Sequence, residues 1–392
     1  MKILRVHNFY REAGGEDAVE LAERELLAGA GHEVVVYERH SAEIADYGPW
    51  RRATLPARCA FAWDARRDLR ALLSRERPAV AHFTNTFPLI SPASYAVCRE
   101  ASVPVVQSLH NYRLLCPAAD FFRAGAPCEE CVEHSLLRSV RYACYRGSRS
   151  ATAALAGALA LHRARGTFAR EVDLYLAPSE FARRKLVAGG LPAERVRVKP
   201  NFVAPDPGPR EAPGDHALYV GRLAAEKGLG TLLTAWEGLP AEIPLRVAGD
   251  GPLRTRLEAR AAGLGTRVRF LGQLPREALL RALRGARLLI FPSEAYETFG
   301  LAIAEAFACG VPVLAAGHGS AAELVEEGRT GLHFRPGDAR DLAARIAWAW
   351  GHPEALLAMG RAARQEYESR YTPERNLALL LELYREAGAR AD

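Results

Sequence analysis

The chain alternates short runs of apolar, often β-branched residues with longer stretches of helical spacing. In the N-terminal half such runs lie at 4–9, 33–37, 80–83, 103–108 and 172–177. The stretch 16–28 has apolar residues at helical spacing and ends before Gly31. Short strands that alternate with helices form βαβ units, so the pattern predicts an α/β fold with a parallel sheet.

Proline and glycine interrupt this pattern most clearly between residues 200 and 214. A second α/β series follows, with strand-like runs at 217–220, 245–248, 267–271, 288–291 and 311–314. A chain of 392 residues is also long for a single core. We therefore predict two Rossmann-like parallel-sheet domains at 1–204 and 205–370. A terminal helix at 376–387, within the segment 371–392, could belong to either domain.

Composition narrows the class of protein. Hydrophobic residues make up 49% and charged residues 25%, as in ordinary soluble proteins. A net charge of +6 is mild, and no nucleic-acid-binding motif is present. No signal peptide or run of about 18 apolar residues is visible, and the longest candidate is 151–161. These features predict a cytoplasmic protein with reduced cysteines.

The run 217–220 leads into a glycine-bounded loop that carries Arg222 and Lys227. Ligands of open α/β sheets bind at the carboxyl ends of strands, and helix N-termini attract anions. An arginine and a lysine at this place predict a diphosphate site. The alternative is two solvated cations on a surface loop.

A second constellation follows the run 288–291. Glu305 is the one charged residue in an otherwise apolar helix, and a buried glutamate needs a partner, such as a ligand hydroxyl. Glu297 lies one loop earlier, and the amides of Phe299, Gly300 and Leu301 open the helix, where they can meet an anion. The alternatives are that Glu305 pairs with an arginine or caps the backbone, and that Glu297 is an ordinary loop carboxylate.

Three further positions carry weaker signals. Gly14 and Gly15 follow the first strand and would permit close approach of a ligand, although a plain tight turn explains them nearly as well. His110 follows the strand at 103–108, where a packed or surface histidine is the simpler interpretation. No Asp-x-Asp pair occurs, so a carboxylate-held catalytic metal has no obvious site.

Taken together, these motifs resemble those of the retaining GT-B glycosyltransferases of family 4. The resemblance rests on Gly-Arg-Leu with Glu-Lys-Gly at 221–228, Val-Ala-Gly-Asp-Gly-Pro at 247–252 and Phe-Leu-Gly at 270–272. It extends through Glu-Thr-Phe-Gly-Leu at 297–301 to Glu305 and covers most of the chain, including the Gly-Gly loop. Thr298 departs from the proline that many members carry there.

The resemblance implies two domains facing a cleft and transfer of a sugar from a UDP- or GDP-sugar with retention of configuration. Arg222 and Lys227 would hold the donor diphosphate, and Glu305 the ribose. Glu297 and the three amides would hold the donor sugar, and His110 would lie against it. The acceptor would be a glycan, a lipid-linked or a small molecule, as in cell-envelope polysaccharide synthesis. No catalytic metal would be needed, and the last helix would cross back to the N-terminal domain.

Two competing functions remain open at this stage. A sugar-nucleotide epimerase on the same fold would act on the donor without an acceptor. A non-catalytic nucleotide-binding protein is the other alternative. A dinucleotide oxidoreductase is disfavoured, because no Gly-x-Gly-x-x-Gly follows the first strand.

Two features of the N-terminal half suggest further partners. Cys116, Cys128, Cys131 and Cys144 crowd into one segment poor in regular structure, which predicts a structural zinc site. His134 could replace one thiolate, and four unrelated reduced thiols are the alternative. Arginines from Arg138 to Arg165 flank the apolar run 151–161, which suggests peripheral contact with the inner face of a membrane. The alternative there is a buried helix with a solvated basic flank.

Overall fold

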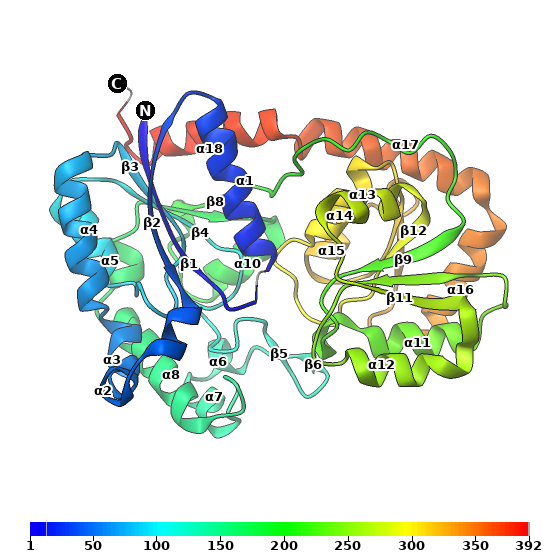
Figure 1. The fold of residues 1–392 in the computed structure, drawn as a ribbon, viewed down its shortest axis with the longest axis horizontal. Coiled ribbons are helices and arrows are strands. Elements are labelled where there is room, and N and C mark those ends of the chain that lie inside the picture. Colours follow the sequence, from blue (N-terminus) through cyan, green and yellow to red (C-terminus); the bar gives the residue numbers. More distant parts are fainter. Residues whose placement is uncertain (13, 391–392) are drawn as a thin grey trace. The chain divides into compact units, whose positions relative to one another are not determined.

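The computed structural model describes residues 1–12 and 14–390, which divide into two compact units. The first unit comprises Met1–Phe121, Glu129–Pro200 and the chain from Asn376 onward. The second comprises Phe122–Cys128 and Asn201–Arg375. Each unit has one six-stranded sheet with helices around it (Figure 1), so the predicted α/β class with two parallel-sheet domains is confirmed.

The sheet of the first unit is parallel throughout, with the strand order β2-β1-β3-β4-β7-β8. Its strands are β1 (Lys2–Phe9), β2 (Glu33–His40), β3 (Val80–Asn85), β4 (Val105–Ser108), β7 (Leu174–Ala177) and β8 (Val196–Val198). The order reverses between β1 and β3, which makes this the switch point of the sheet. Strand β8 was not predicted, because three residues are too few to show a period.

The helices of the first unit differ widely in length. The longer ones are α1 (Gly15–Gly29), α4 (Trp63–Glu76), α5 (Ser94–Glu100), α8 (Arg149–Ala164), α10 (Glu180–Ala188) and α18 (Pro373–Glu386). The shorter ones are α2 (Pro49–Ala53), α3 (Leu55–Ala60), α6 (Glu130–Glu133), α7 (Leu137–Arg141) and α9 (Thr167–Arg170), with 3-10 turns at Ser41–Asp46 and Ala193–Arg195. Leu380, Leu383 and Tyr384 of α18 belong to the same hydrophobic cluster as Ile3 and Val106, so α18 completes the core of this unit.

The sheet of the second unit is also parallel, with the order β11-β10-β9-β12-β13-β14. Its strands are β9 (His216–Val220), β10 (Leu245–Ala248), β11 (Val268–Gly272), β12 (Ala286–Phe291), β13 (Val313–Ala316) and β14 (Gly331–Phe334). Here the order reverses between β9 and β12. The loops that leave the carboxyl ends of these two strands therefore flank the position where open α/β sheets bind ligands.

Helices cover both faces of this second sheet. They are α11 (Leu229–Glu237), α12 (Arg254–Ala261), α13 (Arg276–Arg284), α14 (Leu301–Ala308), α15 (Gly319–Leu324), α16 (Ala339–Gly351) and α17 (Pro353–Arg370), with 3-10 turns at Ala225–Lys227 and Ala262–Arg267. Helix α14 packs against α17, and every residue from Ile303 to Ala308 is buried. The prediction of a buried helix at this place is confirmed.

A long loop and a short pair of strands complete the described chain. Residues 199–215 contain no helix or strand, as the prolines predicted, and lead from β8 to β9. A short antiparallel pair, β5 (Phe122–Arg123) and β6 (Ala126–Pro127), was not predicted. Within residues 1–12 and 14–390, no helix is both long and apolar enough to span a bilayer.

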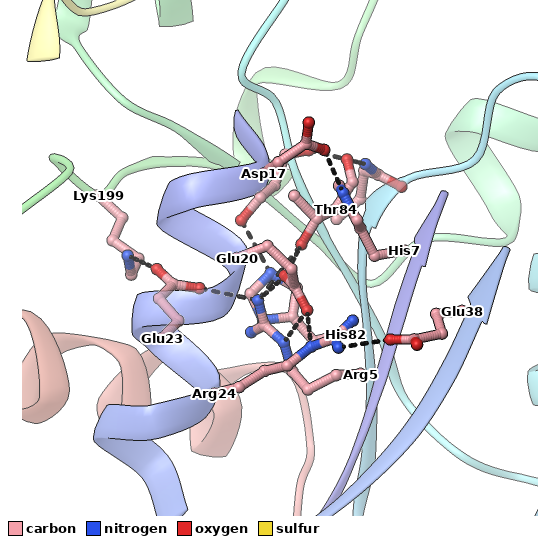
Figure 2. Close-up of polar contacts among 12 residues, drawn as sticks. Arg5, His7, Asp17, Glu20, Glu23, Arg24, Glu38, His82, Thr84 and Lys199 are labelled. Atoms are coloured by element: carbon pink, nitrogen blue, oxygen red, sulfur yellow. Dashed lines mark hydrogen bonds and ion pairs between the residues drawn. The ribbon is translucent and has the colours of Figure 1, made fainter. Parts of the chain in front are cut away.

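A buried ionic network stabilises the first unit around Arg5, which lies on β1 and is fully buried (Figure 2). The Arg5 guanidinium pairs with Glu20 and Glu23 of α1, the latter at 3.0 Å. Glu23 also pairs with Lys199, which follows β8. Arg5 donates to His82 Nδ1 on β3, and to Tyr384 Oη on α18 at 3.1 Å. The network therefore joins α1, α18 and the sheet.

The charges of this network fix its protonation states. Burial alone would raise the pKa of Glu20, but the charge of Arg5 lowers it far below its usual range. Burial, reinforced by Arg5, holds the pKa of His82 well below 6.5, so this ring is neutral. Its Nδ1 accepts from Arg5 and from Tyr384 at 2.7 Å, which leaves Nε2–H to donate to Ser108 Oγ at 2.8 Å.

Candidate active site

The two loops at the switch point of the second sheet are bound directly to each other. The loop after β9 presents the carbonyl of Glu226, which accepts from the amides of Glu294 at 2.9 Å and Ala295 at 3.2 Å in the loop after β12. Gly228 has φ +69°, and a Cβ there would lie 1.9 Å from the carbonyl oxygen of Pro292. Glycine is therefore required for this close approach of the two backbones.

Lys227 and Glu297 form an ion pair between these loops. Lys227 Nζ lies 2.5 Å from Glu297 Oε1, which also accepts from Ser293 Oγ at 2.7 Å. Burial alone would raise the pKa of Glu297, but the charge and hydrogen bonds of Lys227 and Ser293 lower it overall. Burial lowers the pKa of Lys227, and the charge of Glu297 more than reverses that effect. Both groups are therefore charged at neutral pH.

Sequence reasoning missed two groups beside this pair. Ser293 lies in the loop after β12, as Glu297 does, and it donates to the Glu297 carboxylate. His318 Nε2 lies 2.9 Å from the carbonyl oxygen of Ser293. His318 caps α15 directly after β13, so it also lies at a carboxyl end of the sheet. That position, one residue before Gly319, was the sequence signal that could have identified it.

The start of α14 presents backbone donors next to the same loop. Gly300 is the N-cap residue, with φ +97° in the left-handed region. The carbonyl of Phe299 accepts from Ser320 Oγ at 2.9 Å, which holds the turn in place. Within the described chain, the amides of Phe299, Gly300 and Leu301 donate to no other protein group. These donors and the dipole of α14 suit an anion or sugar oxygen.

Glu305 has a protein partner, which corrects one step of the reasoning from sequence. It is buried as predicted, but its Oε1 pairs with Arg276 at the start of α13. Burial still raises the pKa of Glu305, because Arg276 only partly compensates for it. Pairing with an arginine was the alternative to a ligand contact, so burial alone no longer argues for a ribose site. The ion pair between Lys227 and Glu297 is instead the main indication of a ligand site in this unit.

The other predicted residues of this unit lie in more open settings. Arg222 is exposed in the loop after β9, and Tyr219 Oη donates to its carbonyl at 2.9 Å. Asp250 accepts from the amide of Gly251 at 2.7 Å and pairs with Arg254 at 2.9 Å. These bonds make Asp250 a turn-stabilising residue.

Gly14, Gly15 and His110 belong to the first unit. Gly14 caps α1, and its amide donates to Asp17 Oδ2 at 3.0 Å, while Asp17 Oδ1 lies 2.8 Å from His7 Nε2. A Cβ at either glycine would meet nothing within 4 Å, so open space lies beside this loop. Burial lowers the pKa of His110 to about 4, which keeps the ring neutral at pH 7.

The predicted four-cysteine zinc site is not assembled in the structure. No group of three or more His, Cys, Asp or Glu side chains within residues 1–12 and 14–390 is arranged to hold a metal ion. Cys116 and Cys131 are buried and hydrogen-bonded to each other. This bond outweighs burial and lowers the pKa of Cys116 to about 7. The Cys-x-x-Cys spacing alone does not bring the thiols into a tetrahedral set.

Elemental analysis of purified protein tests the zinc prediction directly. A structural site would give about one zinc per chain and a lower content in a Cys128→Ser/Cys131→Ser variant. A folded wild type with no stoichiometric zinc would instead show that the four cysteines are reduced thiols, two of which are hydrogen-bonded to each other. A Cys98→Ser variant is the matched control, because Cys98 is a buried residue of α5 and lies outside the segment that holds the four cysteines.

The fold and this site define a class of protein, the GT-B glycosyltransferases. Residues 18–207 match the model of Glycosyltransferase Family 4, and residues 209–366 match that of Glycosyl transferases group 1. The chain belongs to the group 1, family 4 glycosyltransferases, as the sequence motifs predicted.

Solved structures with the same fold cover nearly the whole chain. Anabaena Alr3699/HepE in complex with UDP has a TM-score of 0.68 at 20% identity, over 97% of this chain and 99% of that one. Sucrose-phosphate synthase from Thermosynechococcus elongatus has a TM-score of 0.71 at 21% identity, over 98% and 99%. At such identities the likeness concerns the fold.

Curated relatives are more similar in sequence over shorter stretches. Sulfoquinovosyl transferase SQD2 of Arabidopsis thaliana is 31% identical over 51% of this chain and 42% of its own length. Alpha-D-kanosaminyltransferase of Streptomyces kanamyceticus is 27% identical over 75% and 73%. The match spans less than half the length of the first of these relatives.

Proposed function

We propose that this protein is a glycosyltransferase that uses a nucleotide-diphosphate sugar, with UDP-sugars as the first donors to test. The observation that carries the proposal is the Lys227–Glu297 pair at the switch point of the second sheet. It brings a cation for a diphosphate and a carboxylate for sugar hydroxyls to adjacent loops. Family membership supports the same chemistry, and structures of HepE contain UDP and UDP-glucose.

In this proposal the chain's own charges stabilise the leaving diphosphate. Lys227 and Arg222 neutralise it, and the amides at the start of α14 add donors. Glu297 is ionised and accepts from the donor-sugar hydroxyls, while Glu305 accepts from the ribose hydroxyls beside Arg276. No catalytic metal enters the scheme. Retention of configuration and a glycan, lipid-linked or small-molecule acceptor complete the proposal, and the proposed place of action is the cytoplasm.

A thermal-shift screen of UDP- and GDP-sugars tests the donor class. A ligand at 100 times its dissociation constant adds about 2.7 kcal/mol to the stability of the folded state. For a domain of this size, that corresponds to roughly 5–10 °C in the midpoint of unfolding. The transition of the second unit is expected to rise with the true donor. No shift with any nucleotide sugar would contradict the proposal.

The two glutamates are expected to separate nucleotide binding from turnover. Glu305→Gln should weaken UDP itself by about 10- to 100-fold, because a charged acceptor is lost. Glu297→Gln should leave UDP affinity within about threefold and lower the rate of UDP release from UDP-glucose by a similar 10- to 100-fold. Calorimetry and a coupled UDP assay measure these effects, with Glu277→Gln on the exposed side of α13 as a control. Equal losses of UDP affinity would refute this division of roles.

A further inference from the structure

One surface of the first unit combines exposed apolar side chains with many arginines. It is formed by α2, α3, α7 and α8 with the first residue of α4, and we call it the arginine-rich surface. Helix α3 packs on both α2 and α8, and α7 packs on α8, so the four helices form one continuous end of the unit (Figure 1).

Large apolar side chains on this surface point into solvent. Trp50 in α2 is 89% exposed, and Leu137 at the start of α7 is 75% exposed. Trp63, which follows α3, is 53% exposed, and Leu161 in α8 is 42% exposed. The outer face of α8 continues this apolar character with small exposed residues at 153, 157, 160 and 164. Several large exposed apolar side chains on one group of packed helices are typical of an interaction surface.

The charge of the same surface is predominantly positive. Residues 135–170 contain no Asp or Glu and carry Arg138, Arg141, Arg146, Arg149, Arg163, Arg165 and Arg170, and residues 47–63 contain none either. The flanking carboxylates neutralise part of this charge: Asp64 pairs with Arg58, Arg39 and Arg51, and Glu130 pairs with Arg138. In the described chain, no carboxylate pairs with Arg141, Arg146 or Arg149, so their charge faces outward.

We propose that the arginine-rich surface docks the protein on a bilayer of anionic lipids. Tryptophan and leucine side chains would enter the interfacial layer, and arginines would meet lipid phosphates. A second copy of the chain is a poor occupant, because a symmetric interface would place these arginines against each other. The proposal adds a partner to the proposed function, since a lipid-linked acceptor would be reached from this surface.

This assignment extends the expectation from sequence, which rested on 138–165 alone. Helix α8 buries Leu155, Ala156 and Leu159, so one of its faces belongs to the core. The exposed tryptophans come from α2 and the start of α4, which no local pattern in 138–165 could reveal. Folding brings the two segments together.

Co-sedimentation of the full-length protein with vesicles tests the proposal. Vesicles of phosphatidylglycerol and phosphatidylcholine are compared with pure phosphatidylcholine, at low and at 0.5 M salt. The wild type is expected to bind the anionic vesicles and to be released by salt. Arg141→Gln/Arg149→Gln should lower the partition coefficient about fivefold per arginine. Trp50→Ser/Leu137→Ser should lower it about tenfold or more, because two large apolar side chains are lost.

A matched control and a second readout keep the outcomes distinct. Trp348→Ser/Arg361→Gln removes an exposed tryptophan and an exposed arginine from the second unit, and it should bind vesicles like the wild type. All variants should keep UDP affinity in calorimetry, so loss of UDP binding with intact vesicle binding would fault the proposed function instead. Wild-type protein that ignores anionic vesicles at low salt, or binds neutral ones equally well, overturns the docking proposal. So would a dimer that dissociates in the Trp50→Ser/Leu137→Ser variant without any change in vesicle binding.

Discussion

An Arg222→Ala/Lys227→Ala variant is expected to lose about 100- to 10,000-fold in affinity for UDP. Hydrogen bonds to charged groups contribute about 1.5–3 kcal/mol each, and both cations lie in the loop after β9 that borders the switch point of the sheet. Isothermal calorimetry with UDP measures the loss. Unchanged affinity in the double variant would remove the diphosphate site from this loop.

The two single variants should behave differently. Arg222 is exposed, so Arg222→Ala should reduce affinity with little change in stability. Lys227→Ala also leaves Glu297 without its ion-pair partner. The pKa of Glu297 would then rise, because Lys227 is the main group that lowers it. A decrease in the unfolding midpoint of the second unit should therefore accompany Lys227→Ala.

Arg254→Ala is the matched control for both variants. Arg254 is a partly exposed cation near the carboxyl end of β10, and it pairs with Asp250.

The positions of Lys227 and Glu297 could be predicted because sequence and topology agree there. Each lies in the loop after a short strand that ends in four apolar residues, 217–220 and 288–291, and the carboxyl ends of parallel strands share one edge of a sheet. The reversal of strand order between β9 and β12 was not visible in the sequence, although it is what makes these two loops neighbours. The βαβ pattern predicted the sheet, and only the fold established the order of its strands.

Pairing between distant residues could not be predicted in the same way. Glu305 was identified by its burial, but Arg276, its partner, lies 29 positions earlier in a helix whose polar residues look solvated. Arg5 and Tyr384 are 379 positions apart. In the sequence, a charged residue within the first strand looks like an exposed side chain at the edge of a sheet. Local propensity has no information on such contacts, because they form only when the sheet, α1 and α18 pack together.

The stability of the first unit should depend strongly on Arg5. Arg5→Met keeps the volume of the side chain but leaves Glu20 and Glu23 facing each other without their shared cation. Removing one partner of a buried ion pair costs about 3–5 kcal/mol. For a unit of this size, the expected decrease in its unfolding midpoint is roughly 10 °C. Calorimetry and circular dichroism, read for the transition of the first unit, measure it.

Two comparison variants show whether the cost comes from the network. Arg70→Met removes an exposed cation that pairs with Glu100 at the surface of the same unit, so it should cost about 1 kcal/mol or less. Arg5→Met combined with Glu20→Gln should cost clearly less than the sum of the two single changes, because the second change removes a charge that the first left uncompensated. Additive losses, or an Arg5→Met protein as stable as the wild type, would show that α1 is held by its apolar contacts alone. A non-additive result would instead establish that Arg5 holds the carboxylates of α1 against the sheet, with Tyr384 of α18 bound to the same guanidinium.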